Sequence, residues 1–146
     1  MKILILNGPS LNLLGKRNPD VYGTHTLEDI QSALNDKAGQ LQIELIFSQS
    51  NHEGELIDIL QQNSNCNGII FNPGAFTHTS IAIADALESI DIPTVEVHLS
   101  NIYAREEFRS HSYIAPVAIG QISGFGLSGY LAALDLINEY LTNQND

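Results

Sequence analysis

Five short apolar runs alternate with stretches of helical periodicity, and this alternation constrains the fold more than any other feature of the chain. The runs cover residues 3–6, 43–47, 69–71, 94–99 and 117–122. A final helical pattern follows the last run and carries Leu127, Leu131, Leu134 and Leu141 on one face. Near-continuous apolar strands that alternate with helices are typical of a parallel sheet covered on both faces.

Five such strands in 146 residues predict an α/β fold, a flavodoxin-like doubly wound five-stranded parallel sheet with helices on both faces. No linker, repeat or low-complexity stretch interrupts the pattern, so residues 1–146 are expected to form a single domain. Residues 26–29 and 50–53 have the spacing of helix capping boxes. Ligands of this fold bind beyond the carboxyl ends of the strands. Polar residues, glycine and proline gather there, in residues 7–24, 72–80 and 98–112.

The composition excludes several classes of protein. The single cysteine, Cys66, cannot form an internal disulfide and fits a reducing compartment. The run at residues 3–6 is too short for a signal peptide, and no run approaches the roughly 18 apolar residues of a membrane helix. Six basic and seventeen acidic residues give a net charge of −11, which disfavours nucleic acid and anionic lipid as partners. We therefore expect a cytoplasmic protein that binds neither nucleic acid nor a membrane.

Four of the six cations fall in two short segments. Lys16 and Arg17 are adjacent, and Arg105 and Arg109 lie four residues apart. The grouping has two interpretations: chance clustering that includes a helical arginine pair, or a local site for a small anion.

Familiar cofactor motifs do not fit the chain. Residues 124–129 spell G-x-G-x-x-G, but no strand follows to supply a ribose-binding acid, so close packing at a helix start is the better interpretation. Residues 8–16 have the wrong glycine spacing for a P-loop, and Arg17 stands where serine or threonine would bind magnesium. The histidines and Cys66 have no metal-ligand spacing. We expect no metal and no cofactor.

Glu96 and His98 lie two residues apart in the fourth apolar run, so their side chains share one face of a strand. An unpaired carboxylate would be costly in that buried position. An ionised Glu96 would orient the imidazole and favour its protonated form, which makes His98 a candidate general acid. The alternative is a structural polar pair at a strand end.

Tyr22 lies five residues after Arg17 in the loop that follows the first run. A phenol ionises near pH 10 and becomes a usable base only when a cation stabilises its phenolate, which Arg17 could do. Asn12 and Asn72 are neutral donors suited to a developing oxyanion. A surface tyrosine and two turn asparagines are the alternative interpretation.

These segments together resemble the type II 3-dehydroquinate dehydratases. The similarity runs through residues 7–15, 17–23, 72–80, 96–101 and 104–113, and it covers essentially the whole chain in order. The chain departs from the family at Ser10, where asparagine is usual, at Asn18, where glutamate is common, and at Ala84, often arginine. None of the three is assigned to chemistry, although Ala84 bears on subunit contacts.

The resemblance implies elimination of water from 3-dehydroquinate, through an enolate, to give 3-dehydroshikimate. By that likeness Tyr22, as a phenolate supported by Arg17, removes the proton next to the ketone. Asn12 steadies the enolate through a water molecule. His98, held by Glu96, protonates the departing hydroxyl. The three lysines lack the apolar pocket that a Schiff-base lysine needs, so an imine route is not expected.

The resemblance also assigns the substrate contacts. Leu99 and Ser100 would bind the carboxylate, and the ring hydroxyls would be held by Asn72, His78 and Arg109; a role for Arg105 stays open. Asp85 follows His78 by seven residues on what is predicted to be one helix, about 10 Å along its axis. Asp85 would then act across a subunit interface, in keeping with the dodecamers, built from trimers, that the family forms. The alternative is a surface aspartate.

Three other functions stay open at this point. The same reaction could serve aromatic amino-acid biosynthesis in the shikimate pathway or quinate breakdown. A flavodoxin-like carrier of a flavin or nucleotide would need phosphate-cradling turns, which the loop at residues 7–24 lacks. A scaffold that has lost the chemistry would be expected to lack Tyr22, Arg17 or His98, and all three are present.

Overall fold

Five parallel strands form the centre of the structure, a computed structural model that describes residues 1–144. The strands are β1 (Lys2–Asn7), β2 (Glu44–Gln49), β3 (Gly68–Asn72), β4 (Thr94–His98) and β5 (Gly120–Ser123). Their order in the sheet is β2-β1-β3-β4-β5, with every neighbouring pair parallel. This is the flavodoxin-like order, which confirms the predicted fold class.

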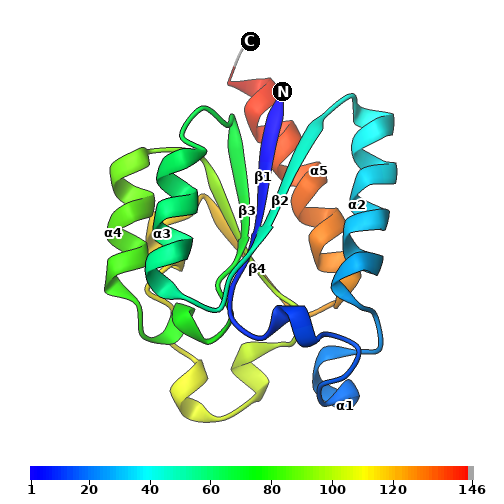
Figure 1. Ribbon diagram of the computed structural model, residues 1–146, viewed down its shortest axis with the longest axis vertical. Coiled ribbons are helices and arrows are strands. Elements are labelled where there is room, and N and C mark those ends of the chain that lie inside the picture. Colours follow the sequence, from blue (N-terminus) through cyan, green and yellow to red (C-terminus); the bar gives the residue numbers. More distant parts are fainter. Residues whose placement is uncertain (145–146) are drawn as a thin grey trace.

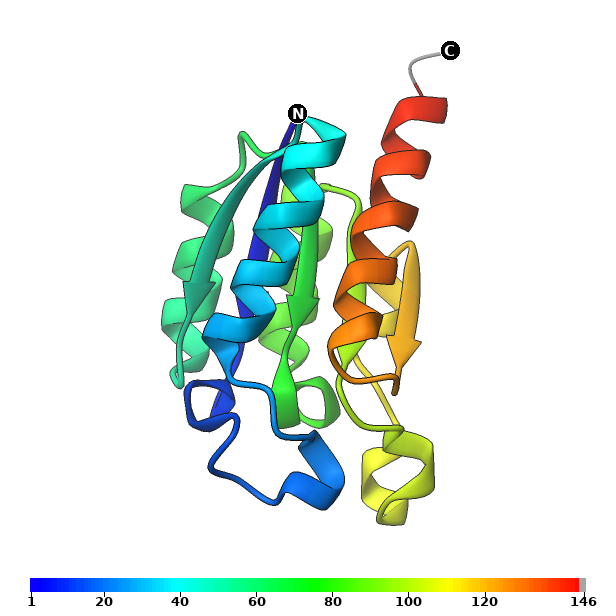
Figure 2. The same ribbon diagram turned by 90° about the vertical axis from the view of Figure 1, so that its right-hand side faces the viewer.

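Helices cover both faces of the sheet. Figure 1 and Figure 2 show α2 (Leu27–Leu41) and α5 (Leu127–Asn143) on one face and α3 (Glu53–Gln62) and α4 (Ile81–Ile90) on the other. Shorter pieces build the loops at the carboxyl edge: η1 (Leu11–Leu13), α1 (Pro19–Tyr22), η2 (Gly74–His78), η3 (Ile102–Ala104) and η4 (Glu107–Arg109). Another, η5 (Ala115–Val117), leads into the start of β5. Within residues 1–144, none of the helices has the length and apolar character needed to cross a membrane.

Strand β1 shows why the apolar runs are nearly continuous. Ile3 and Ile5 pack into the core formed with α2 and α5, while Leu4 and Leu6 point the opposite way toward α3 and α4. All four side chains are fully buried. A strand covered on both faces has no solvent side, so no polar alternation is expected.

The capping prediction holds for α2 and is wrong for α3. Thr26 and Asp29 form a complete capping box, with reciprocal bonds between side chain and backbone. At α3 the N-cap is His52, which makes no side-chain capping bond. Ser50 lies two residues too early, so its hydroxyl accepts from the His52 N–H and donates to Glu55 instead.

Strand β5 begins three residues later than predicted, at Gly120. The first residue of the apolar run, Val117, ends η5, where Pro116 stands in the first turn, and residues 118–119 form a bend before the strand. Proline has no N–H for a strand ladder and a fixed φ that suits a helix start. The prediction of close packing at residues 124–129 is confirmed, because a side-chain carbon on Gly129 would lie 2.9 Å from the Gly124 carbonyl oxygen.

Strands β1 and β3, which β2 separates along the chain, are neighbours in the sheet at the switch point of this topology, where ligands of the fold bind. The turns that follow them are in direct contact. The Gly8 N–H donates to the Asn72 carbonyl oxygen at 2.7 Å, and a side-chain carbon on Gly8 would lie 2.4 Å from the Pro73 carbonyl oxygen. Only glycine fits at residue 8 without moving one turn away from the other.

Candidate active site

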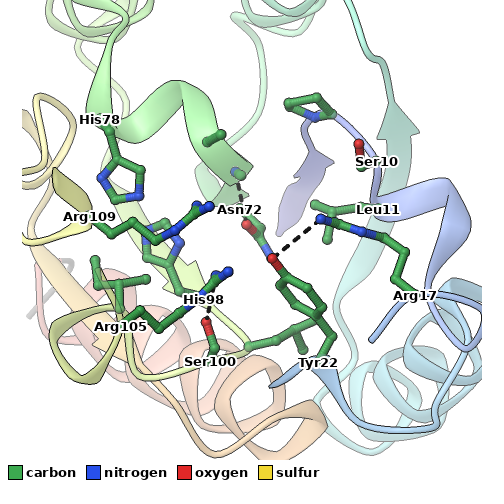
Figure 3. A pocket seen from close by; sticks show the side chains of 15 residues that line it. Ser10, Leu11, Arg17, Tyr22, Asn72, His78, His98, Ser100, Arg105 and Arg109 are labelled. Carbon is green, nitrogen blue, oxygen red and sulfur yellow. Dashed lines mark hydrogen bonds between the residues drawn. The ribbon is translucent and has the colours of Figure 1, made fainter. Parts of the chain in front are cut away.

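A cavity lies beyond the carboxyl edge of the sheet, between the loops that follow β1, β3 and β4 (Figure 3). It brings together most of the residues that the sequence predicted for the site: Arg17, Tyr22, Asn72, His78, His98, Leu99, Ser100 and Arg109. Arg105, whose role was open, also lines it. The predicted Asn12, Asp85 and Glu96 do not, and Glu96 is fully buried behind His98.

The predicted Glu96–His98 pair is present and buried. Glu96 is 0% exposed and His98 5%, and the His98 Nε2–H donates to Glu96 Oε2 at 2.6 Å. Three further donors surround the carboxylate: Thr77 at 3.1 Å, Ser112 at 2.7 Å and Gln121 at 2.6 Å. The carboxylate is therefore satisfied by donors from β4, η2, β5 and the loop before η5.

Burial alone would raise the pKa of Glu96, but the hydrogen bond and charge of His98, with the bonds from Ser112 and Gln121, outweigh it. The net result is a pKa below the ordinary glutamate value, so Glu96 is ionised at neutral pH. Because Nε2 of His98 is committed to Glu96, Nδ1 is the nitrogen left to serve the cavity.

Tyr22 is the last residue of α1 and lies between two arginines. Arg17 Nη2 donates to the phenolic oxygen at 3.3 Å, and its Cζ lies 4.3 Å from the centre of the tyrosine ring. Arg105 approaches the same ring, with its Cζ 5.1 Å from the ring centre. Of the residues that the structure describes, Tyr22 is the one tyrosine of the cavity lining, and it has a guanidinium group on either side. Figure 3 shows the Tyr22–Arg17 pair across the cavity from His78 and Arg109.

His78 is held as a neutral acceptor. Its Nδ1–H donates to the His111 carbonyl oxygen at 2.8 Å. Burial lowers the pKa of His78, and the nearby charges of His98 and Arg109 lower it further, against the backbone bond to His111. A neutral ring that donates through Nδ1 presents an unprotonated Nε2, which suits a ligand hydroxyl.

Arg105 and Arg109 do not form a helical pair, so that interpretation of the cation grouping is wrong. Arg105 has extended backbone after η3, and Arg109 ends η4. Glu106 lies between them, with its carboxylate 2.7 Å from Arg109 Nε and 3.9 Å from Arg105 Nε. With Arg17, three guanidinium groups line a cavity that has no lining carboxylate, which suits an anionic ligand.

Asn12 and Asp85 lie outside the lining for different reasons. Asn12 lies in η1 with an exposed side chain, and Ser10, two residues earlier, lines the cavity instead. Asp85 is exposed on α4, whereas His78 ends η2. The prediction that His78 and Asp85 share one helix is wrong, because the chain breaks at Thr79 before Ser80 caps α4.

Sequence reasoning missed three groups that surround Glu96: Thr77, Ser112 and Gln121. Gln121 had a usable signal, because it is a polar residue in an otherwise apolar run. Once the strands are paired it stands in register with Glu96. Thr77 and Ser112 had none, since each comes from an irregular loop. Within residues 1–144, no group of three or more His, Cys, Asp or Glu side chains could hold a metal ion.

Comparison with known proteins gives a consistent result. The family described as Dehydroquinase class II matches residues 1–138. The 3-dehydroquinate dehydratase of Trichodesmium erythraeum is 57% identical over 99% of this chain and 97% of its own, and that of Gloeothece citriformis is 60% identical over 95% and 92%. The crystal structure of a type II dehydroquinase from Butyrivibrio crossotus superposes with a TM-score of 0.93 at 48% identity, covering 94% of this chain and 97% of that one.

Proposed function

Because the chain belongs to the class II dehydroquinase family, we propose that its cavity binds 3-dehydroquinate and eliminates water from it to give 3-dehydroshikimate. One observation carries the proposal. Tyr22, flanked by two arginines, and His98, bonded to the buried Glu96, line the same cavity, so a candidate base and a candidate acid can act on one small molecule.

The first step is removal of the proton next to the ketone. Tyr22 as a phenolate accepts this proton, and the electron pair of the broken C–H bond moves onto the ketone oxygen as an enolate. Arg17 and Arg105 stabilise the phenolate before the transfer, because each guanidinium lies close to the ring.

The enolate oxygen needs a neutral donor. Asn12 is proposed to act through a water molecule, since its side chain lies outside the lining. The hydroxyl of Ser10, which lines the cavity, is a second donor for the same water or for the oxyanion itself.

The second step is loss of the hydroxyl. The enolate electrons return to form the conjugated double bond, and the departing hydroxyl takes a proton from His98 Nδ1 and leaves as water. Glu96 stays ionised and stabilises the imidazolium before the transfer. Tyr22 and His98 exchange protons with solvent afterwards.

The remaining lining residues are proposed to bind the substrate. The backbone N–H groups of Leu99 and Ser100, with the Ser100 hydroxyl, would hold the carboxylate. Asn72, His78 and Arg109 would hold the ring hydroxyls, with His78 Nε2 as an acceptor.

Assembly and location are proposals as well. A dodecamer built from trimers would let Asp85 reach a neighbouring subunit's cavity, and its exposed position on α4, next to the exposed Ile81, fits that role. As a member of a metabolic enzyme family, the protein is proposed to act in the cytoplasm on the shikimate pathway. Quinate breakdown uses the same step, and rescue of an aromatic auxotroph would separate the two roles.

An ultraviolet assay for the conjugated enone tests the proposal. Wild-type protein with 3-dehydroquinate should give rising absorbance, and Tyr22→Phe should lower kcat by about a thousandfold. Absence of product from the wild type would overturn the function. A near-normal kcat for Tyr22→Phe would overturn only the choice of base.

A further inference from the structure

A buried chain of hydrogen bonds lies beneath the cavity, between the ends of β1 and β3. Tyr130, on α5, is fully buried. Its hydroxyl donates to Asn7 Oδ1 at 2.6 Å and accepts from Asn72 Nδ2 at 2.9 Å. Asn7 and Asn72 are paired in register as the last residues of their strands. Tyr130 therefore joins the two strands at the switch point of the sheet.

The direction of this chain follows from counting hydrogens. A phenol has one hydrogen to donate, and Asn7 Oδ1 receives it, so the Tyr130 oxygen can only accept from Asn72. At the other end of the Asn72 amide, the Gly74 N–H donates to Oδ1 at 3.1 Å. Both contacts require the same amide orientation. A half-turn of the amide would lose both bonds and bring two donors together at Gly74.

Tyr130 keeps its hydrogen across the working range of pH, because burial raises the pKa of this phenol well above its ordinary value. Its side chain does not line the cavity, so it cannot touch a ligand there. Asn72 does line the cavity, where Figure 3 shows its amide at the back of the site. Any effect of Tyr130 on a ligand must pass through Asn72.

We propose that Tyr130 is a positioning residue that fixes the amide orientation of Asn72 and thereby sets which hydrogen-bonding groups meet the substrate ring. The second N–H of Nδ2 and the second lone pair of Oδ1 are left for a ring hydroxyl. This inference rests on the proposed function in taking that hydroxyl to belong to 3-dehydroquinate.

Tyr130→Phe removes only the hydroxyl. We expect KM for 3-dehydroquinate to rise about tenfold while kcat changes less than about threefold, because a binding contact is loosened and the acid and base are untouched. The pH profile of kcat/KM should keep its shape. Tyr140→Phe is the matched control, since Tyr140 lies on the same helix, is 37% exposed and does not line the cavity.

A double-mutant cycle separates positioning from a general loss of stability. In an Asn72→Ala background, Tyr130→Phe should leave KM unchanged, because the group it positions is gone. The same rise in KM in both backgrounds would overturn the inference.

Nuclear magnetic resonance of the Asn72 side-chain amide gives a readout that does not need turnover. The signal is assigned by its loss in Asn72→Ala, and it should shift in Tyr130→Phe but not in Tyr140→Phe. A protein that fails to dehydrate 3-dehydroquinate but shows this shift would overturn the proposed function and retain the positioning role. An active protein whose Asn72 signal is unmoved in Tyr130→Phe would overturn the positioning role alone.

Discussion

The interior of the protein holds the proposed general acid of the cavity (the acid side), whereas a loop holds the proposed base (the base side). Glu96 and His98 lie on a central strand, nearly without exposure, and the carboxylate accepts from four side chains. Tyr22 ends a one-turn helix and is partly exposed, with one 3.3 Å bond to Arg17. The two sides therefore differ in how much their side chains contribute to the stability of the folded protein. Changes to the acid side should lower stability and activity together, and changes to the base side activity alone.

The largest expected effect is that of His98→Asn, which breaks the acid side. We expect kcat to fall about a thousandfold through loss of the general acid. The free energy of unfolding should fall by about 3 kcal/mol, because the buried, ionised Glu96 loses its partner His98. The enone assay and urea unfolding measure the two effects. Tyr22→Phe should lower kcat by a similar factor but leave the free energy of unfolding unchanged. Equal destabilisation by both variants would contradict the difference between the two sides.

Arg17→Ala tests the base side. Removing one of the two cations next to Tyr22 should lower kcat at neutral pH about a hundredfold, because the proposed base loses its hydrogen-bonded cation. Urea unfolding should be unchanged. Lys16→Ala is the control, because Lys16 is adjacent, carries the same charge and does not line the cavity. Comparable losses in both variants would mean that general charge, and not contact with Tyr22, is responsible.

Acid unfolding sharpens the comparison further. The pKa of Glu96 is held below its ordinary value of 4.5, so the stability it contributes is complete above that pH and is lost as pH falls through the lower folded value. We expect the Glu96→Gln variant not to lose stability in this way as the pH falls. The difference between the two proteins in free energy of unfolding should narrow by on the order of 1 kcal/mol from pH 6 to pH 3. Urea midpoints at several pH values measure it, and a constant difference would contradict an ionised Glu96.

The smallest expected effect is at Ser10, which adopts a left-handed backbone with φ 67°. Asparagine tolerates this conformation better than serine, so Ser10→Asn should raise the free energy of unfolding by a few tenths of a kcal/mol. Its amide would also be a stronger oxyanion donor, and we expect kcat to rise less than about fivefold. Thermal unfolding and the enone assay test both. A tenfold loss of kcat would show that the serine hydroxyl is specifically required.

The sequence predicted the structure correctly where burial or the two-residue period of a strand determines which way a side chain points. Residues 3–6 are apolar on both faces, and Glu96 and His98 share a face by the two-residue period, so the fold and the acid pair could be predicted. The boundary of β5 could not, because an apolar run continues through η5 and only Pro116 marks the change.

The conformations of the loops around the cavity could not be predicted from local sequence patterns. Ser10 and Asn12 lie in the same turn, and which of them faces the cavity depends on how η1 is rotated. Residues 78–85 resemble one continuous helix until the Ser80 hydroxyl caps α4 by accepting from the Ile83 N–H. The donors around Glu96 come from segments up to 25 residues away, and no local period relates them to the carboxylate.

The contact of Gly8 with the Pro73 carbonyl has a consequence for ligand design. These two turns, which follow β1 and β3, contribute Pro9 and Gly74 to the cavity lining, here called its floor. They meet without a gap, so an inhibitor could not grow between them. Affinity has to be gained at the rim, against the arginines and Tyr22, where side chains are partly exposed and can rearrange. Compounds elaborated toward the floor should lose potency in proportion to their added bulk, whereas the same bulk placed at the rim should be tolerated.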